Sequence, residues 1–230
     1  DCIVSGWISS SGKYVEKFES LVAEASNAKF GIATSSGTAA LHLALLAAGV
    51  GRGDEVIVPA LTFISTATAV LHAGGTVVLV DIDEETMCID PDLFFEAITP
   101  RTKAVIPVHL YGHPAQMNRL LEIAKQHEIC VIEDAAEAQG ATFDGSQVGP
   151  LGDMGIFSFY GNKTITTGEG GMVVTNNIQA AEKIRVLRDH GMDPNRRYWH
   201  TMLGFNYRMT NLQAALGYAQ EKSIHFDLGL

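Results

Sequence analysis

Seven short runs of apolar and β-branched residues recur along the chain, and a longer stretch separates each run from the next. The runs cover residues 30–35, 55–59, 76–82, 103–110, 129–134, 155–160 and 171–176. Most of them are continuous rather than alternating, which is typical of strands that are covered on both faces. Strand and helix alternation of this kind predicts an α/β fold with a mainly parallel, seven-stranded sheet flanked by helices.

Four stretches between or beside these runs have apolar residues at helical spacing. These stretches cover residues 14–25, 38–49, 115–128 and 178–191. The second is apolar nearly all round, so we expect a buried helix that ends at Gly49.

The composition excludes several classes of protein. Hydrophobic residues make up 47% of the 230 residues, as in a globular chain. A formal net charge of −10 argues against nucleic-acid binding and gives no support for docking on an anionic membrane. No apolar run in these residues is long enough to span a membrane, and none has the pattern of a signal peptide. Cys2, Cys88 and Cys130 form no CxxC pair, which favours reduced thiols in a cytoplasm.

Sites in α/β sheets lie outside the carboxyl ends of the strands, and "SSGTAALHLAL" (35–45) follows the first such end. Ser36, Gly37, Thr38 and Ala39 would present backbone N–H groups and a hydroxyl at a helix N-terminus, which is a ready phosphate site. The segment could equally be an ordinary N-cap. It is neither GxGxxG nor a Walker loop.

Two carboxylates close the strand in "VIEDAAEAQGA" (131–141), namely Glu133 and Asp134. They could cap a helix or lie in a solvated turn. A carboxylate at this edge could instead hold a positive charge such as a protonated ring nitrogen, because pairing favours both ions.

A lysine surrounded by glycines follows the sixth predicted strand, in "FSFYGNKTITTGEGG" (157–171). A partly desolvated lysine amine is a nucleophile toward aldehydes, and the glycines let a ligand approach the backbone. Lys163 could also be a solvated loop residue. Phe63 in "PALTFISTATAV" (59–70) could stack on a flat ring, although packing in the core is the commoner outcome for such a residue.

The sequence thus offers a phosphate site, an aromatic side chain, a carboxylate at the end of a strand and a lysine. Together these match pyridoxal 5′-phosphate, which has a phosphate, a flat ring, a basic ring nitrogen and an aldehyde. The chain then resembles the DegT/StrS family of pyridoxal-phosphate sugar aminotransferases, of the aspartate-aminotransferase fold type (fold type I), over nearly all of residues 3–220. Within that family it is most similar to the GDP-perosamine synthase group. The segments that carry the resemblance are "SGWISSSGKYVEKFE", "SSGTAALHLAL", "GDEVIVPALTFISTATAV", "VHLYGHPAQM", "EDAAEAQGA", "FSFYGNKTITTGEGG" and "GFNYRMTNLQAALG".

The resemblance implies roles for three chemical groups. Lys163 would bond to the cofactor and then move a proton between donor and cofactor. Asp134 would pair with the ring nitrogen. Glu137 lies where many relatives carry Gln or His near the ring hydroxyl.

The resemblance also implies the cofactor contacts. Gly37, Thr38 and Ser158 would hold the phosphate, and Phe63 would stack on the ring. Asn206 of "GFNYRM" would reach the phosphate of the partner subunit's cofactor, so a homodimer with its active site at the interface is implied.

The implied reaction has L-glutamate as amino donor and a nucleotide-linked 4-keto-6-deoxy sugar as acceptor, for a surface polysaccharide such as O-antigen. Relatives in which histidine replaces the lysine are dehydratases, and Lys163 disfavours that activity. The chain could instead be a lyase, or a truncated paralogue that only binds cofactor or pairs with a full-length subunit.

The resemblance finally implies a division of the chain. We expect an N-terminal arm and helix over 1–28, a cofactor-binding large domain over 29–222 and a divergent tail over 223–230, without the family's smaller C-terminal domain. The resemblance fades after Gln220 and the chain begins at Asp1, so a fragment, a truncated product or a frameshifted copy is expected.

Two further patterns suggest metal sites that we do not expect to form. His109 and His113 could share a metal on a helix, but on a strand that leads into a turn they would diverge. The acidic segment 81–85 is expected to be a solvated turn at the end of a strand rather than a cation site.

Overall fold

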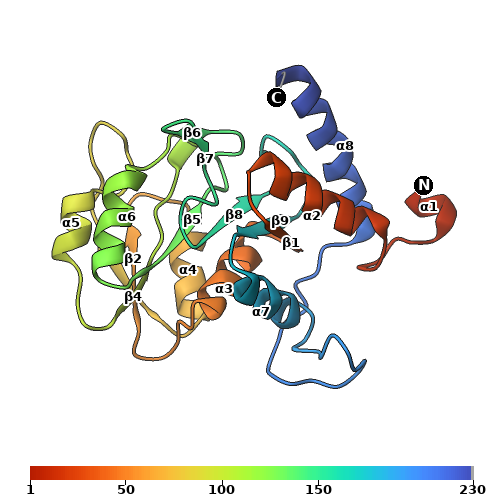
Figure 1. Ribbon diagram of the computed structural model, residues 1–230, viewed down its shortest axis with the longest axis horizontal. Coiled ribbons are helices and arrows are strands. Elements are labelled where there is room, and N and C mark those ends of the chain that lie inside the picture. Colours follow the sequence, from red (N-terminus) through yellow and green to blue (C-terminus); the bar gives the residue numbers. More distant parts are fainter. Residues whose placement is uncertain (229–230) are drawn as a thin grey trace.

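The computed structural model describes residues 1–228, with side chains described as far as Ser223. A seven-stranded sheet in the order β1-β9-β8-β5-β4-β2-β3 forms its centre (Figure 1). The strands are β1 (Phe30–Thr34), β2 (Glu55–Pro59), β3 (Thr76–Val80), β4 (Thr102–Val105), β5 (Cys130–Asp134), β8 (Met154–Ser158) and β9 (Gly171–Thr175). All seven predicted strands are confirmed. The fourth ends at Val105 instead of residue 110, and Pro107, which has no N–H for a ladder, follows shortly after.

One strand of the sheet runs against the others. β9 pairs antiparallel with both β1 and β8, whereas the remaining neighbours pair in parallel. The six other strands therefore all end at the same edge of the sheet, and the prediction of a mainly parallel sheet is confirmed.

Helices flank this sheet, and all four predicted helices are present. The helices are α1 (Cys2–Ser5), α2 (Lys13–Ala25), α3 (Gly37–Ala47), α4 (Ser65–His72), α5 (Pro91–Glu96), the 3₁₀ turn η1 (Leu110–Gly112), α6 (Met117–Gln126), α7 (Ile178–Arg188) and α8 (Asn211–Leu228). A small hairpin of β6 (Thr142–Phe143) and β7 (Ser146–Gln147) was not expected. α4 and α5 are additional to the prediction because 8 and 6 residues are too few to show a helical period.

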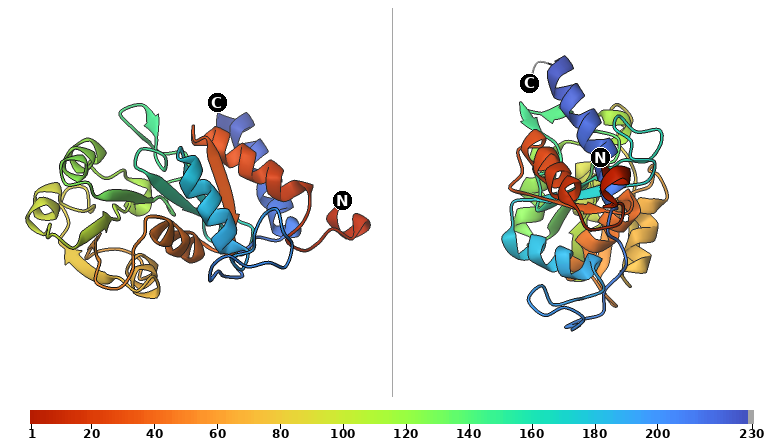
Figure 2. Two further views of the ribbon diagram at one scale, coloured as in Figure 1. Left: turned by 60° about the horizontal axis from the view of Figure 1, so that its bottom comes forward. Right: turned by 90° about the vertical axis from the view of Figure 1, so that its right-hand side faces the viewer.

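Alternate residues of the strands enter cores on opposite faces. In β2, Val56 and Val58 join a core with α3, α4 and α7, whereas Ile57 joins one with α5 and α6. A third core lies on the same face as the second and packs α2 and α8 against β8 and β9. The two further views in Figure 2 show these helices on either side of the sheet. Covering of both faces explains the continuous apolar strands.

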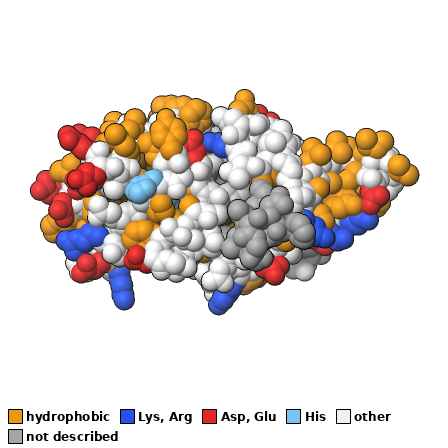
Figure 3. Space-filling view, turned by 90° about the horizontal axis from the view of Figure 1, so that it is seen from above, with side chains coloured by type: hydrophobic (Ala, Val, Ile, Leu, Met, Phe, Trp, Pro, Cys, Tyr) orange, Lys and Arg blue, Asp and Glu red, His pale blue; other side chains and the backbone are white. Residues whose placement is uncertain are grey.

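The N-terminal arm projects from the body at the end where α8 lies beside α2 (Figure 1). Ile3, Val4 and Trp7 are exposed there, and hydrophobic side chains are visible at the right-hand end of the space-filling view (Figure 3). Within the described residues, no helix has the length and apolarity to cross a bilayer. Cys2, Cys88 and Cys130 form no disulfide in this part of the chain.

The acidic segment after β3 is a turn, as expected. The Asp83 carboxylate accepts the amides of Glu85 (3.1 Å) and Thr86 (2.8 Å), and these bonds lower the pKa of Asp83. Such side-chain bonding to amides two and three residues ahead is the ordinary use of aspartate in turns.

Candidate active site

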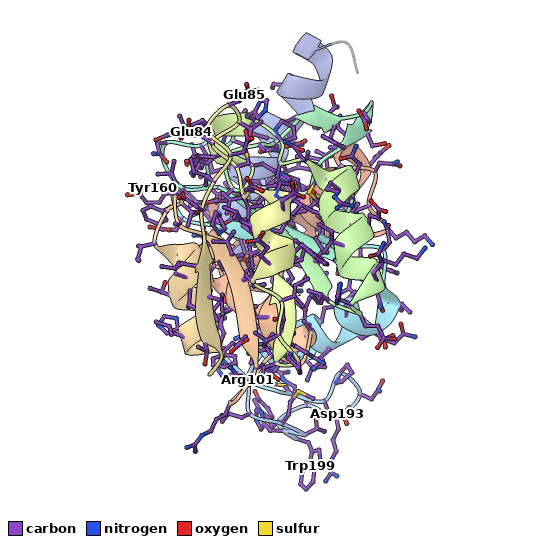
Figure 4. All side chains as sticks on the ribbon, turned by 90° about the vertical axis from the view of Figure 1, so that its left-hand side faces the viewer. Glu84, Glu85, Arg101, Tyr160, Asp193 and Trp199 are labelled. Atoms are coloured by element: carbon purple, nitrogen blue, oxygen red, sulfur yellow. The ribbon has the colours of Figure 1, made fainter. Side chains whose placement is uncertain are left out.

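A cavity of about 440 Å³ opens at the carboxyl edge of the sheet. Loops that follow β1, β2, β5 and β8 line it. Figure 4 shows Tyr160, one of the lining residues, at the same end of the molecule as Glu84 and Glu85, while Arg101 lies at the opposite end. The cavity therefore lies where parallel sheets bind their ligands.

A larger hollow of about 600 Å³ lies at the opposite edge, against the C-terminal ends of α3 and α6. Its lining is largely apolar and includes Cys130. Burial raises the pKa of the Cys130 thiol to about 12, so the nucleophilic thiolate is not formed near neutral pH. The smaller cavity is the candidate site because it combines a lysine, three carboxylates and hydroxyl groups.

The structure brings eight of the nine predicted site residues around this cavity. They are Ser36, Gly37, Thr38, Phe63, Asp134, Glu137, Ser158 and Lys163. Asn206 lies outside the cavity, is exposed, and forms a β-bridge with Asp189. What each of these residues binds stays a prediction.

The turn between β1 and α3 has the form of an anion site. Gly37, Thr38 and Ser158 line the cavity at the N-terminal end of α3, where the helix dipole favours negative charge. The Ser36 hydroxyl accepts the amide of Ala39 at 3.1 Å, so the ordinary N-cap interpretation holds for this side chain.

Close packing explains two of the glycines. A Cβ on Gly171 would lie 2.4 Å from the Ser36 carbonyl oxygen and 2.7 Å from the Gly37 nitrogen. A Cβ on Gly37 would lie 3.0 Å from that of Ser158. The turn can therefore sit on the start of β9 only if no side chain intervenes.

Asp134 forms a buried carboxylate at the floor of the cavity. One oxygen accepts the Thr66 hydroxyl at 2.8 Å and the other accepts the Ala136 amide at 3.2 Å. Burial nevertheless raises the pKa of Asp134, against the lowering effect of the Thr66 and Ala136 hydrogen bonds and of nearby Lys163. A cation placed against this carboxylate would restore its charged form.

Lys163 and Glu137 form an ion pair on the cavity wall, with 3.0 Å between Nζ and Oε1. The other Glu137 oxygen accepts the Tyr111 amide at 3.0 Å. Although burial opposes it, the Tyr111 amide and the Lys163 ammonium together lower the pKa of Glu137. Tyr111 has a φ of 51°, an uncommon left-handed conformation that aims its amide at this carboxylate.

Phe63 is 73% exposed and lines the cavity. The interpretation of Phe63 as a core residue, which is the commoner outcome, is therefore wrong. Tyr160, also exposed, adds a second aromatic ring to the lining.

The neighbouring Glu133 is a structural residue rather than part of the site. It is fully buried and accepts hydrogen bonds from the amides of Gly149 and Gly152, each at 2.7 Å. His109 Nε2 lies 3.0 Å from Glu133, and His109 Nδ1 accepts the Ala115 amide. Both ring nitrogens are thus used, and no group of three metal-ligating side chains occurs among the residues whose side chains are described, 1–223.

Two sets of hydroxyl contacts at the cavity were not found from the sequence. Thr62 bonds to Thr66 at 2.9 Å, Thr66 bonds to Asp134, and Ser65 bonds to Thr38 at 2.8 Å. The available signal was the cluster of hydroxyl residues in "LTFISTATAV", with two threonines four apart as on one helix face. Tyr160, Asn162 and Glu169, which also line the cavity, were likewise missed.

The sequence profile of the DegT/DnrJ/EryC1/StrS aminotransferase family matches residues 1–226. The chain belongs to this family. It is 56% identical to the GDP-perosamine synthase of Caulobacter vibrioides and 49% identical to that of Escherichia coli O157:H7, each over 220 residues and 96% of this chain. The structure of NtdA from Bacillus subtilis, with bound cofactor PMP, matches with a TM-score of 0.92 at 40% identity, over 97% of this chain and 51% of that one.

The family's fold is thereby confirmed for this chain. The alignments cover 59% and 60% of the two synthases, so the chain spans about 60% of the length of these curated relatives.

Proposed function

We propose that this chain forms the cofactor-binding part of an aminotransferase that uses pyridoxal 5′-phosphate and moves an amino group from L-glutamate to a nucleotide-linked 4-keto-6-deoxy sugar. The product would serve surface-polysaccharide synthesis. Family membership and the similarity to two GDP-perosamine synthases support the proposal. The observation that carries it is that Lys163 and Asp134 face one cavity at the N-terminal end of α3.

The residues present fit this cofactor. PMP, bound in the similar NtdA structure, is the aminated form of pyridoxal phosphate. Gly37, Thr38 and Ser158 would hold the phosphate, and Phe63 would cover the ring. Asp134 is a buried carboxylate whose raised pKa calls for a cationic partner, which a protonated ring nitrogen would provide.

The bound cofactor would supply an electron sink for a carbanion. Asp134 would keep the proton on the ring nitrogen. The Lys163 amine would take a proton from the donor carbon and return it as a general acid, and the 3.0 Å contact with Glu137 would orient that amine. Phe63 would shield the reacting carbon from water.

The first test is absorption spectroscopy of the purified chain with pyridoxal phosphate. A visible band that is absent in Lys163→Ala, present in the matched surface variant Lys125→Ala, and bleached by L-glutamate would support the proposed donor reaction. A band that ignores glutamate would refute the donor, and a band that persists in Lys163→Ala would refute the assigned lysine.

The acceptor is tested by product analysis. Chain loaded with the aminated cofactor is mixed with GDP-, UDP- and TDP-linked 4-keto-6-deoxy sugars. The similarity to GDP-perosamine synthases leads us to expect amination of the GDP sugar, and amination of only another nucleotide sugar would refute that choice.

We also propose a homodimer. Among the described residues that line the cavity, Lys163 is the one basic side chain, although a phosphate and the carboxylates of glutamate must be bound. Asn206 lies outside the cavity and would reach the phosphate in the partner subunit. Mixing Lys163→Ala with Asn206→Ala should then restore one complete site per hybrid dimer, and failure to restore binding would refute the shared site.

A cytoplasmic location is proposed from the scattered, unpaired cysteines, which suit a reducing compartment. Detection of the protein outside the cytoplasm in fractionated cells would refute it.

A further inference from the structure

Two glutamines of α8 bond to the backbone of the loop that carries Lys163. Gln220 accepts the Thr166 amide at 3.1 Å and donates to the Thr166 carbonyl at 2.7 Å, so it satisfies both main-chain groups of one residue. Gln213 donates to the Glu169 carbonyl at 2.7 Å. The two glutamines are seven residues apart, close to two helical turns, and so lie on one face of α8.

The loop between β8 and β9 forms no regular secondary structure and depends on such bonds for its shape. Within it, the Lys163 amide bonds to the Tyr160 carbonyl at 3.0 Å and the Thr167 amide bonds to the Phe159 carbonyl at 2.9 Å. Gln220 fixes Thr166, which lies between these two points, only three residues from Lys163. Thr166 is partly buried, and loss of a partner for its amide and carbonyl is costly, so this loop conformation depends in part on α8.

The same helix also contacts the loop that carries Glu137. Gln139 donates to the Glu221 carboxylate at 2.6 Å, and Glu221 directly follows Gln220. α8 is therefore bonded to both loops whose side chains meet in the Lys163–Glu137 ion pair.

α8 is itself firmly placed. A Cβ on Gly217 would lie 2.5 Å from the Phe18 ring, so α8 approaches α2 as closely as a glycine allows. The Phe18 ring contacts that of Phe159, with 4.8 Å between centroids. Thr210 and Gln213 bond reciprocally at the start of α8, as in a capping box.

We propose that Gln220, supported by Gln213, is a positioning residue that acts through the Thr166 backbone to hold the Lys163 amine against Glu137 and toward the cofactor. The cofactor part of this statement rests on the proposed function. α8 thus serves as a clamp on the two catalytic loops as well as a packing element.

Hydrogen exchange of the cofactor-free chain tests the clamp without any need for the cofactor. Gln220→Met keeps the length of the side chain but removes both hydrogen bonds, and Gln126→Met on the exposed surface of α6 is the control. Amides in residues 160–171 of Gln220→Met should exchange about tenfold faster than in the parent, while α3 and β5 are unchanged. Gln220→Glu, which keeps the acceptor for the Thr166 amide, should show a smaller increase.

A second readout reports on Lys163 itself. The pH profile of the Lys163-dependent visible band should shift in Gln220→Met but not in Gln126→Met. Parent-like exchange in the loop, or faster exchange over the whole chain, would overturn the proposal. So would faster loop exchange with an unchanged pH profile. If the parent fails to bind pyridoxal phosphate, the proposed function fails, whereas the exchange result still decides whether α8 clamps the loop.

Discussion

Gly171→Ala adds one methyl group beneath the turn that precedes α3. Its Cβ would lie 2.4 Å from the Ser36 carbonyl oxygen and 2.5 Å from the Ser36 carbonyl carbon, so about 1 Å of displacement is needed to restore ordinary contact. The atoms that the methyl group meets are backbone atoms, which cannot rotate away as a side chain would. Overpacking of this kind lowers folding stability by about 1–3 kcal/mol. For a chain of this size that corresponds to a fall in Tm of roughly 2–12 °C.

The same displacement would move Gly37 away from a bound phosphate. A shift of about 1 Å would lengthen the hydrogen bonds from this turn to the phosphate, and a hydrogen bond to a charged group contributes about 1.5–3 kcal/mol. Affinity for pyridoxal phosphate should therefore fall about tenfold or more, which is more than the stability loss explains. Gly161→Ala is the matched control, because Gly161 lies in the lysine loop and a Cβ there meets nothing within 4 Å. Thermal unfolding and cofactor titration measure both effects. Parent-like affinity in Gly171→Ala would refute the close approach as the basis of the phosphate turn.

Three further substitutions test the electrostatics and the cavity rim. Burial raises the pKa of Asp134, so its ionised form opposes folding as pH rises above the unfolded value of about 4. Asp134→Asn should therefore raise the Tm of the cofactor-free chain at pH 7, lose that advantage below about pH 4, and abolish cofactor binding; a lower Tm at pH 7 would contradict this. The pKa of Glu137 is lowered in the folded chain, so ionised Glu137 stabilises the fold. This contribution to stability is present above the unfolded pKa of about 4.3 and is lost as the pH falls through the folded pKa. Glu137→Gln should thus reduce the loss of Tm that the chain shows as the pH is lowered below about 4.3. An unchanged dependence of Tm on pH would count against the ion pair with Lys163. Phe63→Ala should weaken cofactor binding about tenfold with little change in Tm, since the side chain is 73% exposed and ring stacking contributes about 0.5–1.5 kcal/mol; equal weakening in Leu71→Ala, an exposed residue of α4, would remove the specific role of Phe63.

The sequence predicts the sheet well because each strand is a continuous apolar run and each long helix has its own period. Short elements escape this signal. α5, which Asp90 caps, is only 6 residues long, and α4 is rich in serine and threonine. Neither helix therefore shows an apolar stripe. The end of β4 is set by Pro107 and by pairing that only the folded sheet reveals.

A site residue can be predicted from the sequence when its type and its immediate neighbours are unusual. It is harder to predict when its role depends on a residue that is distant in the sequence. Lys163 and Asp134 stand out because a lysine among glycines and a carboxylate after an apolar strand are unusual. The hydroxyl contact of Thr66 with Asp134 joins residues 68 positions apart, and no local pattern marks it. Phe63 illustrates the same limit, since exposure depends on what the fold leaves uncovered.

The place of β1 in the sheet has a consequence for biosynthesis. β1 is the first strand to be synthesised, and it lies at the edge of the sheet. Its neighbour in the sheet is β9, which follows more than a hundred residues later in the sequence. A nascent chain must therefore carry β1 and the apolar helix α3 without their sheet partner while the intervening strands emerge. Pairing over such separations is slow and leaves apolar surface open to aggregation. The turn at Ser36–Gly37 rests on Gly171 and can reach this packing only after β9 is made, so the phosphate end of the site is completed later than β1 to β8.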